Sequence, residues 1–476
     1  MADTPEPLFL PVAELSRRLH AKTLSPVALA EAHLARIEDL DPTLHAYRLV
    51  TPERALAQAR SAEIQLQAGL SLGPLHGIPY ASKDLFDVAG LPTTAGSKTL
   101  EGNIARADCT VTRRLAQAGM VLLGKTHTVE FAFGSVGVNH PQGTPHNPWA
   151  QAPHAPGGSS SGSAVAVAAG LAPVATGSDT ACSVRGPAAL CGVVGLKTTV
   201  GRISRAGVFP LSPTLDSVGP LALTVEDAAL IFDALQGIDL QDPSTCGIDP
   251  IDVLQGLDAG VRGLRLGLVE DPFFLDLDPE VDRAVRASLD VFKDLGARVE
   301  SVAFPQAAAA LDLPVFPSGV EGAALNAERL DRQLDLIDPV VKGRMLPNRE
   351  ALAVDYFTTL QTLQRLRRES AAAWVGVDAL VVPTMPLPPL PLATVESDVE
   401  TYLSYAKRYL RNCYVGNLLD WCGVSLPCGF TQQGLPVGLM VYARPFAEDM
   451  ALRVARAFEA ATPWHDRHPD LSWLEG

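Results

Sequence analysis

The stretch TVTRRLAQAGMVLL (Thr110–Leu123) decides the fold class of this chain of 476 residues. Its first part, Thr110–Ala118, is predicted to be a helix, and the short apolar run Met120–Leu123 that follows is predicted to be a buried strand. The same alternation, rich in glycine and other small residues, continues from about residue 75 to residue 225. It predicts an α/β core with buried strands.

Helices and further strands are predicted on both sides of this core. Ser25-Pro26 is typical of a helix start, because a capping hydroxyl precedes a proline at the first helical position. Residues 1–65 are predicted to be helical, and residues 300–375 mostly so. Strands are predicted at Leu264–Val269, Ala379–Val382 and Gly438–Tyr442. No clear linker interrupts the chain, so one continuous fold with an inserted helical region is expected.

The charge balance narrows the classes of partner. Lys and Arg number 38 and Asp and Glu number 53, which gives a net charge of −15 at pH 7. A chain this acidic, without a Lys/Arg-rich run, is not expected to bind nucleic acid or an anionic membrane surface. The N-terminus lacks the layout of a signal peptide, and no stretch is typical of a transmembrane helix.

The cysteines indicate the redox compartment. Seven of them are scattered along the chain, and none forms a CxxC pair. This pattern predicts neither a disulfide framework nor a zinc site. We expect reduced, buried cysteines and therefore a cytoplasmic location.

Three segments carry residues suited to chemistry: His76–Gly90 (HGIPYASKDLFDVAG), Pro156–Gly170 (PGGSSSGSAVAVAAG) and Gly177–Lys197 (GSDTACSVRGPAALCGVVGLK). In the second, a run of glycine and serine leads into a helix of small residues, and exposed amides at a helix N-terminus bind negative charge. The same composition occurs in flexible linkers. A linker is disfavoured here, because the run is short and lies between a tight turn, His146–Trp149, and a helix that requires burial.

Residues Gly158–Gly162 also match the pattern G-x-S-x-G of the α/β-hydrolase nucleophile elbow. An elbow follows an apolar strand, whereas Ala-Pro-His-Ala-Pro-Gly precedes this match. The elbow also needs a downstream acid and then a histidine, and His465 and His468 leave that order open. This interpretation is the weaker one, since nothing else in the sequence supports it.

Ser183 and Lys83 form the alternative pair. A serine hydroxyl is a weak nucleophile until a base takes its proton, and no histidine lies near Ser183 in the sequence. Lys83 acts as that base only if burial or a positive neighbour lowers its pKa from about 10.4. Taken alone, Lys83 is better explained as a surface lysine paired with Asp84, and Ser183 as a turn or cap serine. Their combination favours the catalytic interpretation.

The three segments together resemble the amidase signature family. The family's G-[IV]-P-x-x-x-K-D block is matched by Gly77–Asp84, its GGSS run by Gly157–Ser160, and its nucleophile block by Ser183–Ala188. In the family the relay serine lies 24 residues before the nucleophile, and Ser159 precedes Ser183 by 24 residues here. The resemblance continues outside these blocks and covers most of the chain.

The resemblance implies a role for each matched residue. Ser183 would be the nucleophile, Ser159 would take its proton beside a cis peptide bond, and Lys83 would take the proton from Ser159. Four consecutive residues would supply the backbone amides of the oxyanion hole: Thr180, Ala181, Cys182 and Ser183. Asp179 and Arg185 would shape this loop. The resemblance implies no metal and no organic cofactor.

The resemblance also implies the architecture, a single large α/β domain with a central mixed β-sheet covered by helices on both faces. Residues 1–65 would be an N-terminal helical segment packed on the core, and residues 66–230 the signature core. Residues 231–375 would be a helical insertion on the substrate side, and residues 376–476 the C-terminal part of the core sheet.

The sequence departs from the family directly before the nucleophile, where Ala181-Cys182 replaces the usual Gly-Gly. If either position has a positive φ, a side chain there costs about 1 kcal/mol or more. The added methyl and thiol also narrow the space around the acyl carbon, which predicts an altered or narrower substrate range. Two alternatives stay open: Cys182 is itself the nucleophile, or the chain is a catalytically impaired member.

The prediction is therefore a free-standing amidase that cleaves a small carboxylic amide through an acyl-enzyme. The C-terminal segment Trp464–Pro469 resembles that of stand-alone amidases. The alternative within the family is the glutamine-hydrolysing subunit of a tRNA-dependent amidotransferase. The alternative from another class is a non-catalytic binding protein on the same fold. A small-molecule amide is the expected partner, and a homodimer is the default oligomeric state.

Overall fold

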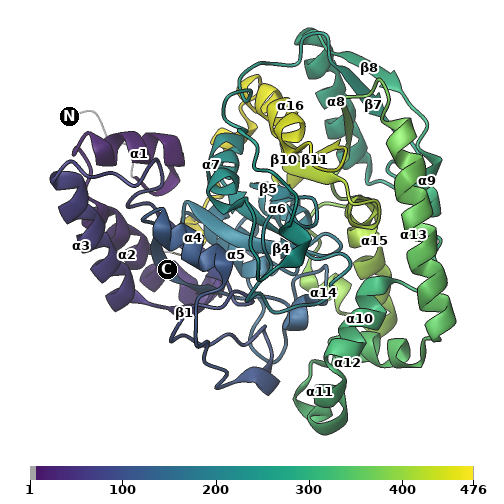
Figure 1. Ribbon diagram of the computed structural model, residues 1–476, viewed down its shortest axis with the longest axis horizontal. Coiled ribbons are helices and arrows are strands. Elements are labelled where there is room, and N and C mark those ends of the chain that lie inside the picture. The colour runs from purple at the N-terminus through teal and green to yellow at the C-terminus, as the bar shows by residue number, and fades with distance from the viewer. Residues whose placement is uncertain (1–6, 475–476) are drawn as a thin grey trace.

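The computed structural model describes residues 7–474. Eleven strands of these residues form one mixed sheet in the order β1-β3-β2-β4-β6-β5-β10-β11-β9-β7-β8 (Figure 1). Their bounds are β1 Tyr47–Val50, β2 Pro79–Lys83, β3 Val121–Thr126, β4 Val174–Asp179, β5 Val194–Lys197, β6 Ser217–Ala222, β7 Arg265–Leu268, β8 Arg298–Ser301, β9 Ala379–Pro383, β10 Cys422–Phe430 and β11 Pro436–Ala443. The predicted α/β class with a central mixed sheet is confirmed.

Sixteen α-helices of the described residues surround this sheet (Figure 1). Their bounds are α1 Val12–His20, α2 Pro26–Leu44, α3 Pro52–Gln67, α4 Thr110–Gln117, α5 Ser161–Ala168, α6 Arg185–Cys191, α7 Val225–Leu235, α8 Pro279–Asp294, α9 Pro305–Ala309, α10 Pro317–Leu325, α11 Ala327–Arg332, α12 Pro339–Met345, α13 Ala353–Ala373, α14 Leu392–Val395, α15 Val399–Leu418 and α16 Glu448–Ala460. Among the described residues, no helix combines the length and the apolar character needed to cross a membrane.

Both faces of the sheet are covered, as the burial along β11 shows. Leu439 and Val441 belong to the apolar cluster that includes residues of α7, α8 and α16. Met440 and Tyr442, which alternate with them, belong to the cluster that includes residues of α13 and α15. Because successive side chains of a strand point to opposite faces, this alternation places helices on both sides of the sheet.

The predicted helix start at Ser25 forms as expected. Ser25 Oγ accepts hydrogen bonds from the backbone N–H groups of Val27 and Ala28, both at 3.1 Å. Pro26 occupies the first helical position of α2, where its missing N–H costs nothing. The capping hydroxyl therefore satisfies amides that would otherwise lack a partner.

The pairing of β2 with β4 positions the centre of the molecule. These two strands run parallel, with Ala81 opposite Ala175. Parallel strands end at the same edge of a sheet, so Lys83 at the end of β2 and Asp179 at the end of β4 lie at one edge. This edge is also where the turn that precedes α6 begins.

The run of glycine and serine forms the entrance to a core helix. Every residue of α5, Ser161–Ala168, is buried. Gly162 allows this burial, since an added Cβ would lie 2.2 Å from the carbonyl oxygen of Ala46. The small residues of α5 therefore let the helix approach neighbouring backbone closely, which a flexible linker does not require.

Residues 231–375 contribute strands as well as helices. β7 and β8 pair in parallel, and β7 also pairs in parallel with β9. They extend the sheet at the edge next to β9, so this range belongs partly to the central sheet. The helices α10 to α13 of the same range lie together in Figure 1, in the green part of the chain.

Candidate active site

Lys83 is buried at the end of β2 and has no exposed surface. Its Nζ donates hydrogen bonds to Ser159 Oγ at 2.8 Å and to Ser178 Oγ at 2.9 Å. Burial lowers the pKa of Lys83 to about 7, against the opposing charges of Asp179 and Asp216. In a large fraction of the molecules the amine of Lys83 is therefore neutral near pH 7 and able to accept a proton.

The carboxylate of Asp84, next to Lys83 in the sequence, has a different partner. Asp84 Oδ1 accepts a hydrogen bond from Lys125 Nζ at 2.8 Å, and both side chains are buried. Thr94 N also donates to Asp84 Oδ2, at 3.1 Å. The simpler interpretation of Lys83, as a surface lysine paired with Asp84, is therefore wrong.

Ser159 is held by backbone contacts on both sides. The Gly158–Ser159 peptide bond is cis. Gly158 N donates to Ser135 O at 2.8 Å, and Ser159 O accepts from Val129 N at 3.1 Å and from Thr128 Oγ1 at 3.0 Å. These hydrogen bonds fix the backbone that presents Ser159 Oγ to Lys83.

Ser183 lies in the turn between β4 and α6, directly beside the run that carries Ser159. The carbonyl oxygen of Ser183 accepts a hydrogen bond from Ser160 N at 3.2 Å. Cys182 Sγ donates to Gly158 O at 3.4 Å. The two serine-bearing segments, 24 residues apart in sequence, therefore touch. Among the hydrogen bonds of residues 7–474, none joins the Oγ atoms of Ser159 and Ser183.

A buried ion pair braces the turn that carries Ser183. Arg185 Nε and Nη2 donate to the two carboxylate oxygens of Asp179, at 3.0 and 2.9 Å. Asp179 Oδ2 also accepts from Val184 N at 3.0 Å, and Asn417 Nδ2 donates to Oδ1 at 2.9 Å. Burial by itself would raise the pKa of Asp179, but the charge and hydrogen bonds of Arg185 lower it to about 2. Asp179 is therefore a charged, fully bonded anchor.

The replacement of Gly-Gly by Ala181-Cys182 creates no backbone strain. Neither residue is among the described non-glycine residues with positive φ. Both side chains line a cavity of about 750 Å³, together with Thr180 and Ser183. Burial raises the pKa of the Cys182 thiol well above its ordinary value, so this sulfur is a neutral thiol near pH 7.

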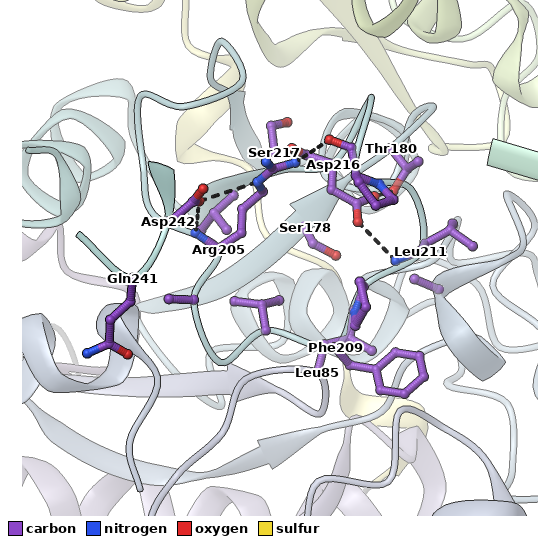
Figure 2. Close-up of a pocket in the computed structure, with 16 residues that line it drawn as sticks. Leu85, Ser178, Thr180, Arg205, Phe209, Leu211, Asp216, Ser217, Gln241 and Asp242 are labelled. Carbon is purple, nitrogen blue, oxygen red and sulfur yellow. Dashed lines mark hydrogen bonds and ion pairs between the residues drawn. The ribbon is translucent and has the colours of Figure 1, made fainter. Parts of the chain in front are cut away.

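A second, smaller cavity of about 220 Å³ also includes Thr180 in its lining (Figure 2). Ser178, Thr180 and Asp216 line it, and Thr180 Oγ1 donates to Asp216 Oδ1 at 2.6 Å. Figure 2 shows Arg205 directed toward Asp242, and Leu211 bonded to Asp216. The negative charge of Asp216 raises the pKa of Lys83, so this cavity influences the electrostatics of the site.

Ser178 and Asp216 were not predicted from the sequence. Ser178 follows Thr176 on β4 by two residues, and Thr176 Oγ1 accepts from Lys83 N at 3.0 Å. Alternate residues of a strand share a face, but only the pairing of β2 with β4 places the face of Thr176 and Ser178 beside Lys83. The place of Asp216 beside Thr180 likewise depends on the pairing of β4 with β6.

The match to the nucleophile elbow has no supporting geometry. Ser160, its central serine, donates from Oγ to Ser178 O at 3.5 Å. His468 stacks on the ring of Phe9 at a centroid distance of 4.1 Å, and His465 Nε2 lies 3.4 Å from Asp466. The two histidines thus have other partners.

Comparison with known proteins gives the same family throughout. The model of the family described as Amidase matches residues 28–452. The chain is 38% identical to a glutamyl-tRNA(Gln) amidotransferase subunit of Cyanothece sp., over 97% of this chain and 99% of that protein. Native peptide amidase from Stenotrophomonas maltophilia has a TM-score of 0.81 and 31% identity, with 97% of each chain covered. 6-Aminohexanoate cyclic dimer hydrolase has a TM-score of 0.88 and 27% identity, with 98% of this chain and all of that chain covered. The chain therefore belongs to the amidase family and is an enzyme of that family.

Proposed function

We propose that this chain hydrolyses a carboxylic amide through an acyl-enzyme formed on Ser183. The observation that carries the proposal is the hydrogen bond of 2.8 Å from buried Lys83 Nζ to Ser159 Oγ. A lysine whose pKa is lowered to about 7 is a competent base near neutral pH. Ser159 lies in the segment that touches the turn of Ser183.

The first step consists of two proton transfers and the formation of one bond. Ser183 Oγ attacks the carbonyl carbon of the amide, Ser159 takes the proton of Ser183, and neutral Lys83 takes the proton of Ser159. The same path returns the proton to the leaving amine, which must be protonated to depart. Water then hydrolyses the acyl-enzyme to the carboxylate.

The oxyanion that forms in this step needs hydrogen-bond donors. Among the hydrogen bonds of residues 7–474, none uses the backbone N–H groups of residues 180–183. These donors belong to Thr180, Ala181, Cys182 and Ser183, which line the 750 Å³ cavity. Each donor of such a hole is typically worth about 3–4 kcal/mol of transition-state stabilisation. The neutral, buried Cys182 thiol disfavours Cys182 as the nucleophile.

Two kinds of amide are candidates for the substrate. A free-standing amidase acts on a small carboxylic amide without partner chains. Glutamine is the candidate that the relatives favour, since proteins 38% identical over 97% of this chain are named as subunits of glutamyl-tRNA(Gln) amidotransferase. On this second proposal, the chain would supply ammonia within a larger complex.

Arg344 of α12 supports a substrate that carries a carboxylate. Its guanidinium lines the 750 Å³ cavity and donates to Phe133 O at 2.8 Å. Burial lowers the pKa of Arg344, and among residues 7–474 no carboxylate forms an ion pair with it. A desolvated cation without an anionic partner favours an anionic group on the ligand.

The test measures the rate of ammonia release from glutamine and from simple amides. It is carried out on the purified chain alone and again together with any chains that copurify with it. Ser183→Ala and Ser159→Ala are expected to abolish release. Ser161→Ala is the matched control from the same run, because Ser161 Oγ has no hydrogen-bond partner among the described residues. Turnover of glutamine only with a partner present would favour the amidotransferase, and full activity of Ser183→Ala would overturn the proposal.

A further inference from the structure

One face of α15 lines the 750 Å³ cavity along much of its length. The lining residues of this helix are Leu403, Lys407, Leu410, Arg411 and Tyr414. Their spacing of three and four residues keeps them on one side of the helix. Tyr414 is buried at one end, and Leu403 is 41% exposed at the other. The helix, yellow-green in Figure 1, therefore runs from the interior of the cavity to its mouth.

The inner end of α15 is attached to the turn that carries Ser183. Asn417 accepts a hydrogen bond from Arg185 Nη2 at 2.6 Å and donates to Asp179 Oδ1 at 2.9 Å. A helix rises about 1.5 Å per residue, which places Arg411 about 9 Å and Lys407 about 15 Å from Asn417 along the axis. The two cations therefore lie at increasing distance from the nucleophile.

Neither cation forms an ion pair with a carboxylate among residues 7–474. Arg411 Nε donates to Asn412 Oδ1 at 3.0 Å, and its Nη2 lies 3.5 Å from Phe273 O. Lys407 Nζ forms no hydrogen bond with the same residues. The cavity is lined by three basic side chains and one acidic side chain, Asp271, although the chain as a whole carries a net charge of −15. Positive charge is thus concentrated where the ligand binds.

The lining of the cavity is largely apolar apart from these cations. Five large apolar side chains contribute to it: Leu275, Leu311, Phe316, Leu403 and Leu410. A volume of about 750 Å³ lies within the range typical of drug-sized ligands. Glutamine is short and polar, so it would leave this wall and the outer cations without contacts.

We propose that the preferred substrate is an amide whose acyl part is an elongated apolar chain ending in an anionic group, and that Arg411 and Lys407 bind this group. The inference rests on the proposed reaction at Ser183. The apolar chain packs against the leucines and Phe316 and removes apolar surface from water. The terminal anion gives Arg411 and Lys407 a direct ion-pair partner, which no carboxylate among residues 7–474 supplies, because Asp276 and Asp271 act on Arg411 only at a distance. Hydrolysis of such a monoamide consumes one water and gives a dicarboxylate and ammonium.

The first test compares chain length and charge in the substrate. The monoamides of succinic, adipic, suberic and sebacic acid are compared with unsubstituted alkanamides of matched length. The expected result is a kcat/KM that rises along the acid series and exceeds that of the neutral amide most for the longest member. Hydrolysis of short and long amides with no preference for the terminal carboxylate would overturn the inference while the proposed function stands.

The second test removes the two charges. Lys407→Gln combined with Arg411→Gln is expected to lower kcat/KM for the sebacic monoamide about 10- to 100-fold, mainly through KM. The ratio of kcat/KM between the acid and the neutral amide is expected to fall by the same factor, because the neutral amide does not use the two cations. Arg408→Gln is the matched control, because Arg408 lies on α15, donates to Asp276 O at 3.2 Å, and does not line the cavity.

A binding measurement separates this inference from the proposed chemistry. Titration calorimetry of the sebacic monoamide into the Ser183→Ala protein needs no turnover. Weaker binding on removal of Lys407 and Arg411 supports the inference, even if no variant or wild-type protein hydrolyses an amide. Binding that is the same with and without the two cations overturns it, even if hydrolysis at Ser183 is established.

Discussion

The rate of amide hydrolysis is expected to rise with pH through about 7, because Lys83 must lose its proton before it acts as a base. Burial lowers the pKa of Lys83 from 10.5 to about 7. This change corresponds to about 5 kcal/mol of destabilisation of the charged form. An unshifted lysine would be neutral in only about one molecule in 3000 at pH 7, against about half for the buried one.

The pH dependence follows from the sign of this change. As pH falls below 7, Lys83 becomes charged and the relay loses its acceptor, so log kcat/KM is expected to fall with a slope of one. At pH 5 about 1% of the lysine is neutral, which predicts a rate about 100-fold below the plateau reached above about pH 8.

The assay is kcat/KM for one amide substrate across pH 5 to 10, since this parameter reports the free enzyme. Protein stability is followed by circular dichroism at each pH, so that unfolding is not mistaken for titration. A rate that keeps rising to pH 10, or one that does not change between pH 5 and 8, would refute the role of Lys83 as a lysine with a lowered pKa.

Three further changes test other parts of the site. Asp179→Asn leaves Arg185 buried without its charged partner. Urea denaturation should then show a free energy of unfolding lower by about 3–5 kcal/mol. A decrease below about 1 kcal/mol would contradict the role of the ion pair in bracing the turn. Asp216→Asn removes a charge that raises the pKa of Lys83, so the rising limb of kcat/KM against pH should move to lower pH. A rising limb that stays at the same pH, or moves to higher pH, would count against this coupling. Cys182→Gly enlarges the cavity beside the nucleophile and should raise kcat/KM for amides with bulky acyl groups relative to short ones. If the variant and the unsubstituted protein have the same relative kcat/KM values over a panel of amides, Cys182 does not determine the substrate range.

Many elements of the fold were predictable because local patterns and tertiary burial agree. The prediction that residues 1–65 are helical was wrong at Tyr47–Val50, which forms β1 because it pairs with the distant strand β3. The helix predicted at Thr110–Ala118 forms as Thr110–Gln117, and the strand predicted at Leu264–Val269 forms as Arg265–Leu268. Each has a periodicity that matches the face it buries. The order of the strands was not predictable, because β5 pairs with β6 and β10 although more than 200 residues separate it from β10.

The candidate site was predictable only where residues are fixed by short motifs. Lys83, Ser159 and Ser183 lie in such motifs, and the structure brings the Lys83 and Ser159 side chains into contact. The neighbours that tune Lys83 depend on strand pairing, which a single sequence does not reveal. The cations of the cavity wall come together because α12 and α15, which are distant in sequence, line one cavity. Their helical periodicity alone gives no reason to expect a ligand.

The most direct test of the central claim is covalent labelling with a fluorophosphonate probe, followed by mass spectrometry of the adduct. The account predicts one adduct on Ser183, lost in Lys83→Ala and retained in Ser161→Ala. An adduct on Cys182, or equal labelling of Ser183 with and without Lys83, would contradict a serine nucleophile activated through Ser159 and Lys83.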